Sequence, residues 1–369
     1  MASIEIPQTL LPRDGRFGSG PSRVRDEQLD ALNTAGRALI GTSHRAAPVK
    51  QLVADLQQHL TELYGLPDGY EVVLGLGGAS VFWDTAAAGL IEQRSQHVVI
   101  GEFSAKFAKA ASAPWLQTPD LREAAFGEAT ANAPTPGIDL YAWPHNETST
   151  GVQLPVRRVD DMGALSVVDG TSAAGGTFVD PAQFDVYYFS PQKNLGSEGG
   201  LWIALMSPAA IERAARIADG DRFIPAALSL QGAITNSRKH QTINTPAIAT
   251  LFLLDQQVQW LLANGGLAWA DARTKQSSQL VYDWAEADTR LTPFVSDPAV
   301  RSQVVTTIDL DESIHAADVT AALRENGIVD VNGYRKLGRN QLRIGTFVAV
   351  EPAEVERLIE SITYVLDRM

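Results

Sequence analysis

Lys193 lies in a short polar segment, Ser190–Asn194, that directly follows an apolar run from Val186 to Phe189. Ligands of α/β sheets gather at the carboxyl ends of strands, which is where this lysine would be placed. An amine attacks a carbonyl only when it is neutral, and burial or cationic neighbours lower a lysine's pKa toward that state. A solvated loop lysine is the commoner explanation of such a residue, so a second signal is needed.

Asp169 supplies the second signal, because it ends another apolar run at Ser166–Val168. The spacing from Asp169 to Lys193 leaves room for one connection and one further strand, so two adjacent strands would hold both side chains. Pyridoxal phosphate acts as an electron sink only while its ring nitrogen is protonated, and an ionised aspartate maintains that proton. An aspartate at a strand end also commonly caps a loop. The pair therefore indicates a pyridoxal-phosphate site more strongly than either residue alone.

The segment Val72–Ser80 reads as a strand, a glycine turn and the start of a helix. Glycines let a phosphate approach the backbone closely, and free N–H groups at a helix N-terminus bind anions. The segment also comes close to the dinucleotide fingerprint G-x-G-x-x-G, with Ser80 in place of the last glycine and Glu102 as the residue that would bind the ribose. A nicotinamide-binding oxidoreductase is therefore the alternative from another class, although it has no use for the paired aspartate and lysine.

Composition narrows the class of protein. The chain has 369 residues, of which 45% are hydrophobic and 20% are charged, and its net charge is −13. With roughly 150 residues per domain, this length suggests two domains. The absence of cysteine excludes disulfides, thiolate metal sites and cysteine nucleophiles. The acidic balance argues against nucleic acid and anionic membranes as partners. With neither a signal-peptide pattern nor a membrane-length apolar run, we expect a cytoplasmic protein without a metal site.

Short apolar runs alternate with helical patterns over most of the chain, which favours a mostly parallel α/β sheet. A helical pattern begins near Pro21 and a clearer one follows Pro48, whereas residues 113–137 contain four prolines and are predicted to form a loop. The predicted strands span residues 72–74, 98–100, 140–143, 165–168, 186–189 and 201–206.

Two long helices are expected after Pro246, broken at Asn264–Gly266, and a smaller α+β unit follows. Its predicted elements are a strand at 303–310, a helix at 316–326, a strand at 341–346 and a helix at 352–367. We therefore expect a large domain of residues 1–264, which includes an N-terminal arm, and a small C-terminal domain of residues 265–369.

The chain resembles the phosphoserine aminotransferase family, in the class V branch of the fold-type I pyridoxal-phosphate enzymes. The matching segments run almost from end to end, and their order and number make the resemblance specific. They are Phe17–Pro21, Thr42–Arg45, Gly77–Ala79, His145–Thr148, Asp169, Gln192–Asn194, Asn244–Pro246 and Asn340–Arg343. The resemblance implies a fold-type I architecture, with a large domain built on a mostly parallel sheet and a smaller α+β domain, assembled as a homodimer with shared active sites.

The resemblance also implies how the chain would hold pyridoxal 5'-phosphate. Lys193 would form the Schiff base and later move the proton between the substrate Cα and the cofactor. Asp169 would pair with the ring nitrogen, and Thr148 would bond the ring hydroxyl. Phe103 would stack on the ring, where the family often has tryptophan. The implied phosphate contacts are the backbone of Ala79 and Ser80, the side chain of Gln192, and Asn244 and Thr245 from the partner subunit.

The same resemblance assigns substrate contacts to this chain. Arg343 would grip the α-carboxylate through a bidentate fork. His44 and Arg45 would contact the distal anion, which is a phosphate in one substrate and a carboxylate in the other. Ser19 would lie near the substrate.

A second distal-anion contact is expected just before Arg343. The family commonly has a His-Arg pair there, whereas this chain reads Gly333–Arg339 with a short insertion. We predict that Arg335 makes this contact, with Lys336 and Arg339 as alternatives.

The resemblance implies a reaction in serine biosynthesis. Amino transfer between L-glutamate and 3-phosphohydroxypyruvate would give O-phospho-L-serine and 2-oxoglutarate. The nearest alternative is another class V aminotransferase that acts on alanine, serine or glyoxylate.

Overall fold

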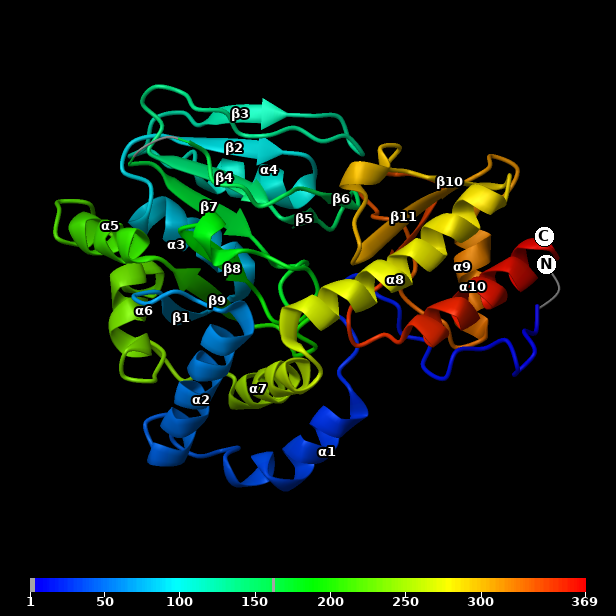
Figure 1. Ribbon diagram of the computed structural model, residues 1–369, viewed down its shortest axis with the longest axis horizontal. Coiled ribbons are helices and arrows are strands. Elements are labelled where there is room, and N and C mark those ends of the chain that lie inside the picture. Colours follow the sequence, from blue (N-terminus) through cyan, green and yellow to red (C-terminus); the bar gives the residue numbers. More distant parts are fainter. Residues whose placement is uncertain (1–3, 161–162) are drawn as a thin grey trace.

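The computed structural model describes residues 4–160 and 163–369 (Figure 1). A seven-stranded sheet in the order β1-β9-β8-β7-β4-β2-β3 forms the centre of the larger unit. Strands β3, β2, β4, β7 and β8 pair in parallel, whereas β9 runs antiparallel to both β8 and β1. The predicted mostly parallel α/β sheet is therefore confirmed. Its strands are β1 (Glu71–Leu76), β2 (Ser95–Val99), β3 (Asp120–Glu123), β4 (Leu140–Pro144), β7 (Leu165–Asp169), β8 (Val186–Phe189) and β9 (Leu201–Met206).

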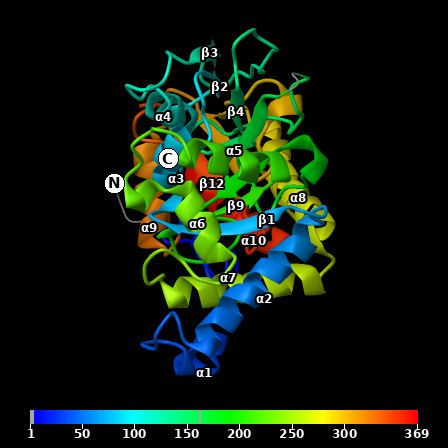
Figure 2. The same ribbon diagram turned by 90° about the vertical axis from the view of Figure 1, so that its left-hand side faces the viewer.

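Helices cover both faces of this sheet because successive side chains along each strand point to opposite faces. Val72 and Leu74 pack into a core with α2 and α7, whereas Val73 packs into a separate core with α3, α4, α5 and α6. The helices of the larger unit are α1 (Asp26–Thr34), α2 (Ala47–Tyr64), α3 (Gly78–Gly89), α4 (Glu102–Ala110), α5 (Pro208–Ala218), α6 (Leu230–Ser237) and α7 (Ile248–Ala263). Figure 2 shows the layers from the side of α5 and α6.

The smaller unit is built on a three-stranded antiparallel sheet in the order β10-β11-β12. Helix α8 joins the units, since Leu267 packs into a core of the large sheet and Val281 into that of the small one. Ile6 and Phe17 also pack into the second core, so the N-terminal arm lies against the smaller unit. The division at residues 264 and 265 stays a prediction. The elements are α8 (Gly266–Ala287), β10 (Leu291–Pro293), β11 (Val305–Leu310), α9 (Ala316–Glu325), β12 (Gln341–Gly345) and α10 (Pro352–Leu366).

Two local predictions were wrong. Residues 113–137 contain strand β3, whose four residues alternate between partial burial and exposure at the sheet edge and carry no apolar run. The helix expected from Pro21 begins only at Asp26. Residues before it pair with the lysine loop instead, since the Ser22 backbone N–H donates to the Gln192 carbonyl at 2.7 Å. A tertiary hydrogen bond thus replaces the first helical turn.

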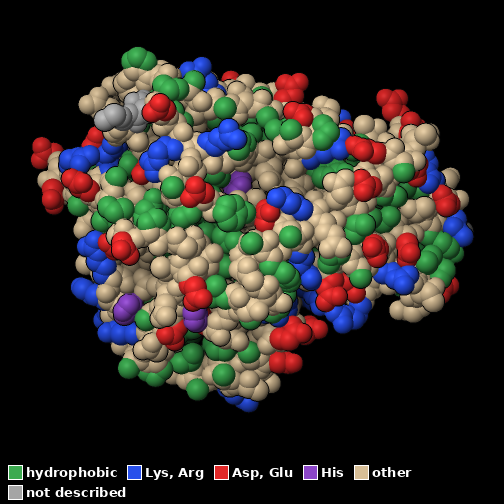
Figure 3. Space-filling model, viewed as in Figure 1, with side chains coloured by type: hydrophobic (Ala, Val, Ile, Leu, Met, Phe, Trp, Pro, Cys, Tyr) green, Lys and Arg blue, Asp and Glu red, His purple; other side chains and the backbone are tan. Residues whose placement is uncertain are grey.

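Acidic and basic side chains are interspersed on the face drawn in Figure 3, so the net charge of −13 is not gathered into one patch there. We find no described helix with the length and apolar character of a membrane span. The described residues also contain no group of three or more His, Asp or Glu side chains arranged to hold a metal ion.

Candidate active site

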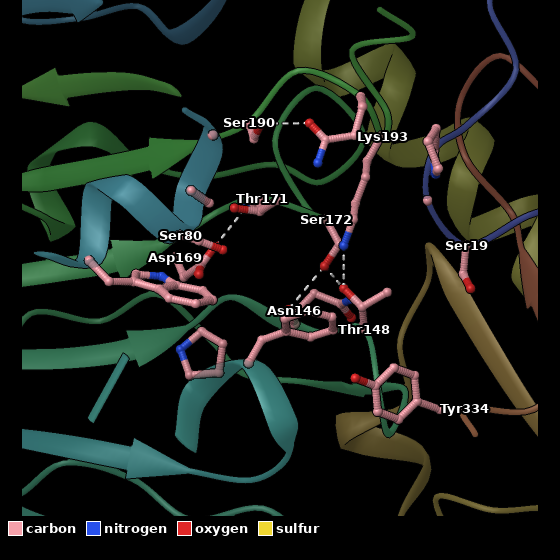
Figure 4. Close-up of a pocket in the computed structure, with 18 of the residues that line it drawn as sticks. Ser19, Ser80, Asn146, Thr148, Asp169, Thr171, Ser172, Ser190, Lys193 and Tyr334 are labelled. Carbon is pink, nitrogen blue, oxygen red and sulfur yellow. Dashed lines mark hydrogen bonds between the residues drawn. The ribbon is translucent and has the colours of Figure 1, made fainter. Parts of the chain in front are cut away.

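A cavity of about 450 Å³ lies at the carboxyl ends of β7 and β8 (Figure 4). Both structural units contribute to its wall. Ser19–Pro21 comes from the N-terminal arm, Gly77–Ser80 from the turn after β1, and Arg343 from β12. Lys193 and Asp169, which the sequence predicts to lie together, both face this cavity.

The Lys193 side chain is almost wholly buried, with 8% of its surface exposed. Its Nζ donates a hydrogen bond to Thr148 Oγ1 at 2.6 Å and lies 5.3 Å from the centre of the Phe103 ring. Burial lowers the pKa of Lys193 to about 8, against the opposing pull of Asp169 and Glu147. About one tenth of this amine is therefore neutral, and nucleophilic, at pH 7.

The N-terminal arm covers the stem of this lysine. A Cβ atom on Gly20 would lie 2.8 Å from Lys193 Cε, and Gly20 has a φ of +133°, which L side chains rarely adopt. Only glycine lets the arm approach this closely. The arm thereby excludes water from the lysine and contributes to its lowered pKa.

Asp169 is the last residue of β7 and lies beside β8, as its spacing from Lys193 predicts. Its Oδ1 accepts from the Thr171 backbone N–H at 2.8 Å, and its Oδ2 accepts from the Tyr188 hydroxyl at 2.9 Å. Figure 4 shows the carboxylate facing the same space as the lysine amine. An ionised carboxylate with both oxygens hydrogen-bonded is well placed to meet a cationic ring nitrogen.

The glycine turn has the backbone geometry that the predicted anion cradle requires. Gly77 and Gly78 have φ values of +99° and +74°, and α3 begins at Gly78. The N–H groups in the first turn of a helix have no intrahelical partner, and here that turn, with Ala79 and Ser80, lines the cavity. Gln192 lies on the same wall, where its Oε1 accepts from Ser190 Oγ at 2.5 Å.

The aromatic wall of the cavity contains Phe103, Trp83 and Tyr334. Phe103 lies in the first turn of α4, whose start is fixed by the fully buried Glu147 carboxylate. That carboxylate accepts from both the backbone N–H and the hydroxyl of Ser104 at 2.9 Å. Phe103 is therefore a ring held in place beside the lysine amine.

Arg343 and Ser19 keep polar atoms free for a ligand. Arg343 Nη1 donates to the Thr148 carbonyl at 3.1 Å, and its guanidinium lies 5.1 Å from the Tyr334 ring centre. Arg343 Nε and Ser19 Oγ are buried without a hydrogen-bond partner within the described chain. Asn146 Oδ1 and Thr171 Oγ1, from the same cavity wall, share this state. Buried polar atoms without partners are costly, so this set fits a polar, anionic ligand.

Five predicted contacts are not among the described residues that line this cavity. Arg335 is one of them, and the other four, His44, Arg45, Asn244 and Thr245, lie on a partly exposed surface. There, His44 Nδ1 and Thr245 Oγ1 are 3.1 Å apart. The structure therefore brings these two predicted segments together, but away from their own lysine.

The three candidate cations before Arg343 differ in their surroundings. Lys336 pairs with Glu102, and Arg339 pairs with Asp309. Arg335 is exposed and forms none of the ion pairs found among residues 4–160 and 163–369. Glu102, which a nicotinamide enzyme would use for its ribose, is also 3.3 Å from Lys106.

Sequence reasoning missed Trp83 and Tyr334, which line the cavity, and Tyr188, which donates a hydrogen bond to Asp169. Trp83 lies one helical turn after the glycine cradle and Tyr334 directly precedes Arg335, so both had a positional signal. Tyr188 had no such signal, since nothing in the sequence distinguishes it from the other buried residues of its strand.

Comparisons with known proteins agree with this geometry. The family Aminotransferase class-V matches residues 19–337. The chain is 56% identical to a putative phosphoserine aminotransferase of Mycolicibacterium vanbaalenii, over 100% of this chain and 99% of that protein. It is 54% identical to a phosphoserine aminotransferase of Nocardioides sp., over 100% and 99%. A solved phosphoserine aminotransferase of Cytophaga hutchinsonii superposes with a TM-score of 0.88 at 24% identity, over 95% of this chain and 99% of that one. The predicted family and fold are confirmed.

The lowered pKa of Lys193 generates a test of reactivity. Only the neutral amine captures an aldehyde, and with a pKa of about 8 its neutral fraction rises from about one tenth at pH 7 to about one half at pH 8. The rate at which the ligand-free protein captures pyridoxal should therefore increase with pH and level off above that midpoint. Stopped-flow absorbance measures it, with a free lysine derivative as control. A midpoint near that of free lysine would contradict the assignment.

Proposed function

This chain belongs to the class-V aminotransferase family, and from that premise we propose that it transfers an amino group between L-glutamate and 3-phosphohydroxypyruvate. The products are O-phospho-L-serine and 2-oxoglutarate, the reaction of a phosphoserine aminotransferase. The observation that carries the proposal is 56% identity, over the whole chain, to a putative phosphoserine aminotransferase. The cavity that holds Lys193, Asp169 and Arg343 supports it.

The donor set of the cavity fits pyridoxal phosphate. When bound, this cofactor supplies an electron sink for the charge left at the substrate Cα. Lys193 would bond to it covalently, and Asp169 would pair with its ring nitrogen. The glycine turn and Gln192 would hold its phosphate, Thr148 would bond its ring hydroxyl, and Phe103 would contact the ring.

The residues around Lys193 also move protons and bind substrate. The Lys193 amine would take the proton from the substrate Cα as a general base, and burial lowers its pKa toward the neutral range that this role needs. Arg343 binds the α-carboxylate, because its Nε has no protein partner to give up. Ser19 and Tyr334 also line the cavity, and we assign them to the surroundings of the bound substrate.

The distal anion requires further cations. Arg335 is the best candidate near Arg343, since Lys336 and Arg339 are already neutralised by Glu102 and Asp309. We assign the substrate phosphate, or the γ-carboxylate of glutamate, to Arg335.

The remaining contacts come from a second copy of the chain. His44 touches Thr245, so the segments around these two residues form one surface. We assign this surface, with Arg45 and Asn244, to the active site of the partner subunit in a homodimer.

The covalent role of Lys193 is tested by borohydride reduction of the cofactor-loaded protein, followed by peptide mapping. The pyridoxyl group should be found on Lys193. Lys193→Ala should lose nearly all turnover yet still bind cofactor, because the phosphate and ring contacts remain. Lys106→Ala is the matched control, since Lys106 Nζ also lies 5.3 Å from the Phe103 ring but pairs with Glu102. A label on Lys106 would refute the assignment.

The substrate assignment is tested by comparing phosphoserine with serine and alanine. Losing one charged hydrogen bond should cost about 2–4 kcal/mol of transition-state binding, so Arg335→Ala should lower kcat/KM for phosphoserine roughly 30- to 1,000-fold. Arg45→Ala should act in the same direction, and use of serine should change little in either variant. Arg339→Ala is the control, because its partner is Asp309. Equal use of serine and phosphoserine by the unmodified enzyme would favour the small-substrate alternative.

The shared active site is tested by subunit exchange. One inactive variant carries Lys193→Ala, and the other carries Asn244→Ala and Thr245→Ala. In a mixed dimer both lesions fall in one site and leave the other intact, so activity should recover toward half the normal value per dimer. Native mass spectrometry confirms exchange. If exchange occurs without recovery, Asn244 and Thr245 serve their own chain.

A further inference from the structure

Asp169 is the last member of a chain of hydrogen bonds that begins at Trp83. The Trp83 indole Nε1–H donates to the Tyr188 hydroxyl oxygen at 2.9 Å, and that hydroxyl donates to Asp169 Oδ2 at 2.9 Å. The three residues come from α3, β8 and β7. None of them is a sequence neighbour of another, so the contact exists only in the fold.

The residues at the two ends of this series of hydrogen bonds determine which group donates and which accepts at each step. An indole N–H can only donate, and an ionised carboxylate can only accept. The hydroxyl between them must therefore accept from Trp83 and donate to Asp169. Burial, and then the neighbouring Asp169 carboxylate, raise the pKa of Tyr188 well above its ordinary value. The hydroxyl proton consequently stays in place throughout the neutral range.

The middle residue is also mechanically constrained. The Tyr188 ring is fully buried and is stacked on Phe82, with ring centres 4.2 Å apart. The Phe107 ring lies nearly perpendicular to the Tyr188 ring, with ring centres 5.8 Å apart. Because Thr171 N–H already holds the second oxygen of Asp169, the carboxylate has one preferred orientation, in which it faces the cavity.

We propose that Trp83 and Tyr188 act as positioning residues that hold the Asp169 carboxylate, through the Tyr188 hydroxyl, aimed at the cofactor ring nitrogen. A hydrogen bond donated to a carboxylate stabilises its charged form, so the proton shared between Asp169 and the ring stays on the ring nitrogen. The electron-withdrawing strength of the cofactor would thereby depend partly on the two hydrogen bonds that lead from Trp83 through Tyr188 to Asp169. The inference rests on the cofactor assignment in the proposed function, but not on the identity of the substrate.

The test compares three variants that each replace a buried ring by phenylalanine. Tyr188→Phe removes one oxygen and keeps the stack on Phe82. Trp83→Phe removes the first donor. Tyr187→Phe is the matched control, because Tyr187 is the adjacent residue of β8, is fully buried, and bonds through its hydroxyl to His145 Nδ1 at 3.1 Å.

Each variant is loaded with pyridoxal phosphate that carries an isotope-labelled ring nitrogen. The nitrogen NMR shift, the pH midpoint of the visible absorption and the cofactor dissociation constant are measured before any substrate is added. Tyr188→Phe should move the nitrogen signal toward that of neutral pyridine and raise the absorption midpoint, because a ring without its proton withdraws fewer electrons. Its kcat should fall on the order of tenfold with both amino-acid substrates, without a matching rise in KM. Trp83→Phe should shift both signals in the same direction by less.

Two results would overturn the proposed positioning role of Trp83 and Tyr188. One is an unchanged nitrogen shift and midpoint in Tyr188→Phe, and the other is an equal change in Tyr187→Phe. Either result leaves the proposed function standing, since the cofactor would still be bound. A protein that takes up no pyridoxal phosphate would instead refute both the cofactor assignment and the proposed role of Trp83 and Tyr188.

Discussion

The parallel pairing of β7 with β8 is the constraint on which the site depends. In its register Asp169 lies opposite Tyr188, and the loop that carries Lys193 begins where β8 ends. A slip of one residue would turn Asp169 to the opposite face of the sheet. The register is held by burial on both faces, because Val168 packs into one core and Val167 into the other. The apolar cores therefore fix the catalytic geometry as well as the stability.

The reactivity of Lys193 depends on segments of the chain that are far apart in the sequence. The N-terminal arm at Gly20 covers the Lys193 side chain, and β12 and the loop before it contribute Arg343 and Tyr334 to the cavity wall. Both segments belong to the smaller unit by their packing, as Phe17 and Leu342 show. Docking this unit against the large sheet removes water from Lys193, so the lowered pKa and the enclosed pocket have one cause.

The sequence was sufficient for features that depend on local patterns. Apolar runs predicted the buried strands, and the polar residues just after two of them predicted the meeting of Asp169 and Lys193. Strand β3 was missed because an edge strand needs no apolar run. The bond from Trp83 to Tyr188 spans 105 positions, and no local pattern encodes a contact of that range. The position of His44 beside Thr245 was likewise decided by tertiary packing.

In an acidic protein, pairing with carboxylates determines which lysines and arginines remain available to bind an anionic substrate. Carboxylates outnumber cations in this chain, with 43 acidic and 30 basic residues, and both Lys336 and Arg339 pair with a carboxylate. Such pairs contribute little to stability, yet each one lowers the local attraction for a free anion. Arg343 escapes pairing because its neighbours are a carbonyl and an aromatic ring, and one of its nitrogens is left without a partner. Selection of an anionic substrate therefore depends on the few cations without carboxylate partners. A change that releases Lys336 from Glu102 would alter the preference for anionic substrates without adding a cation.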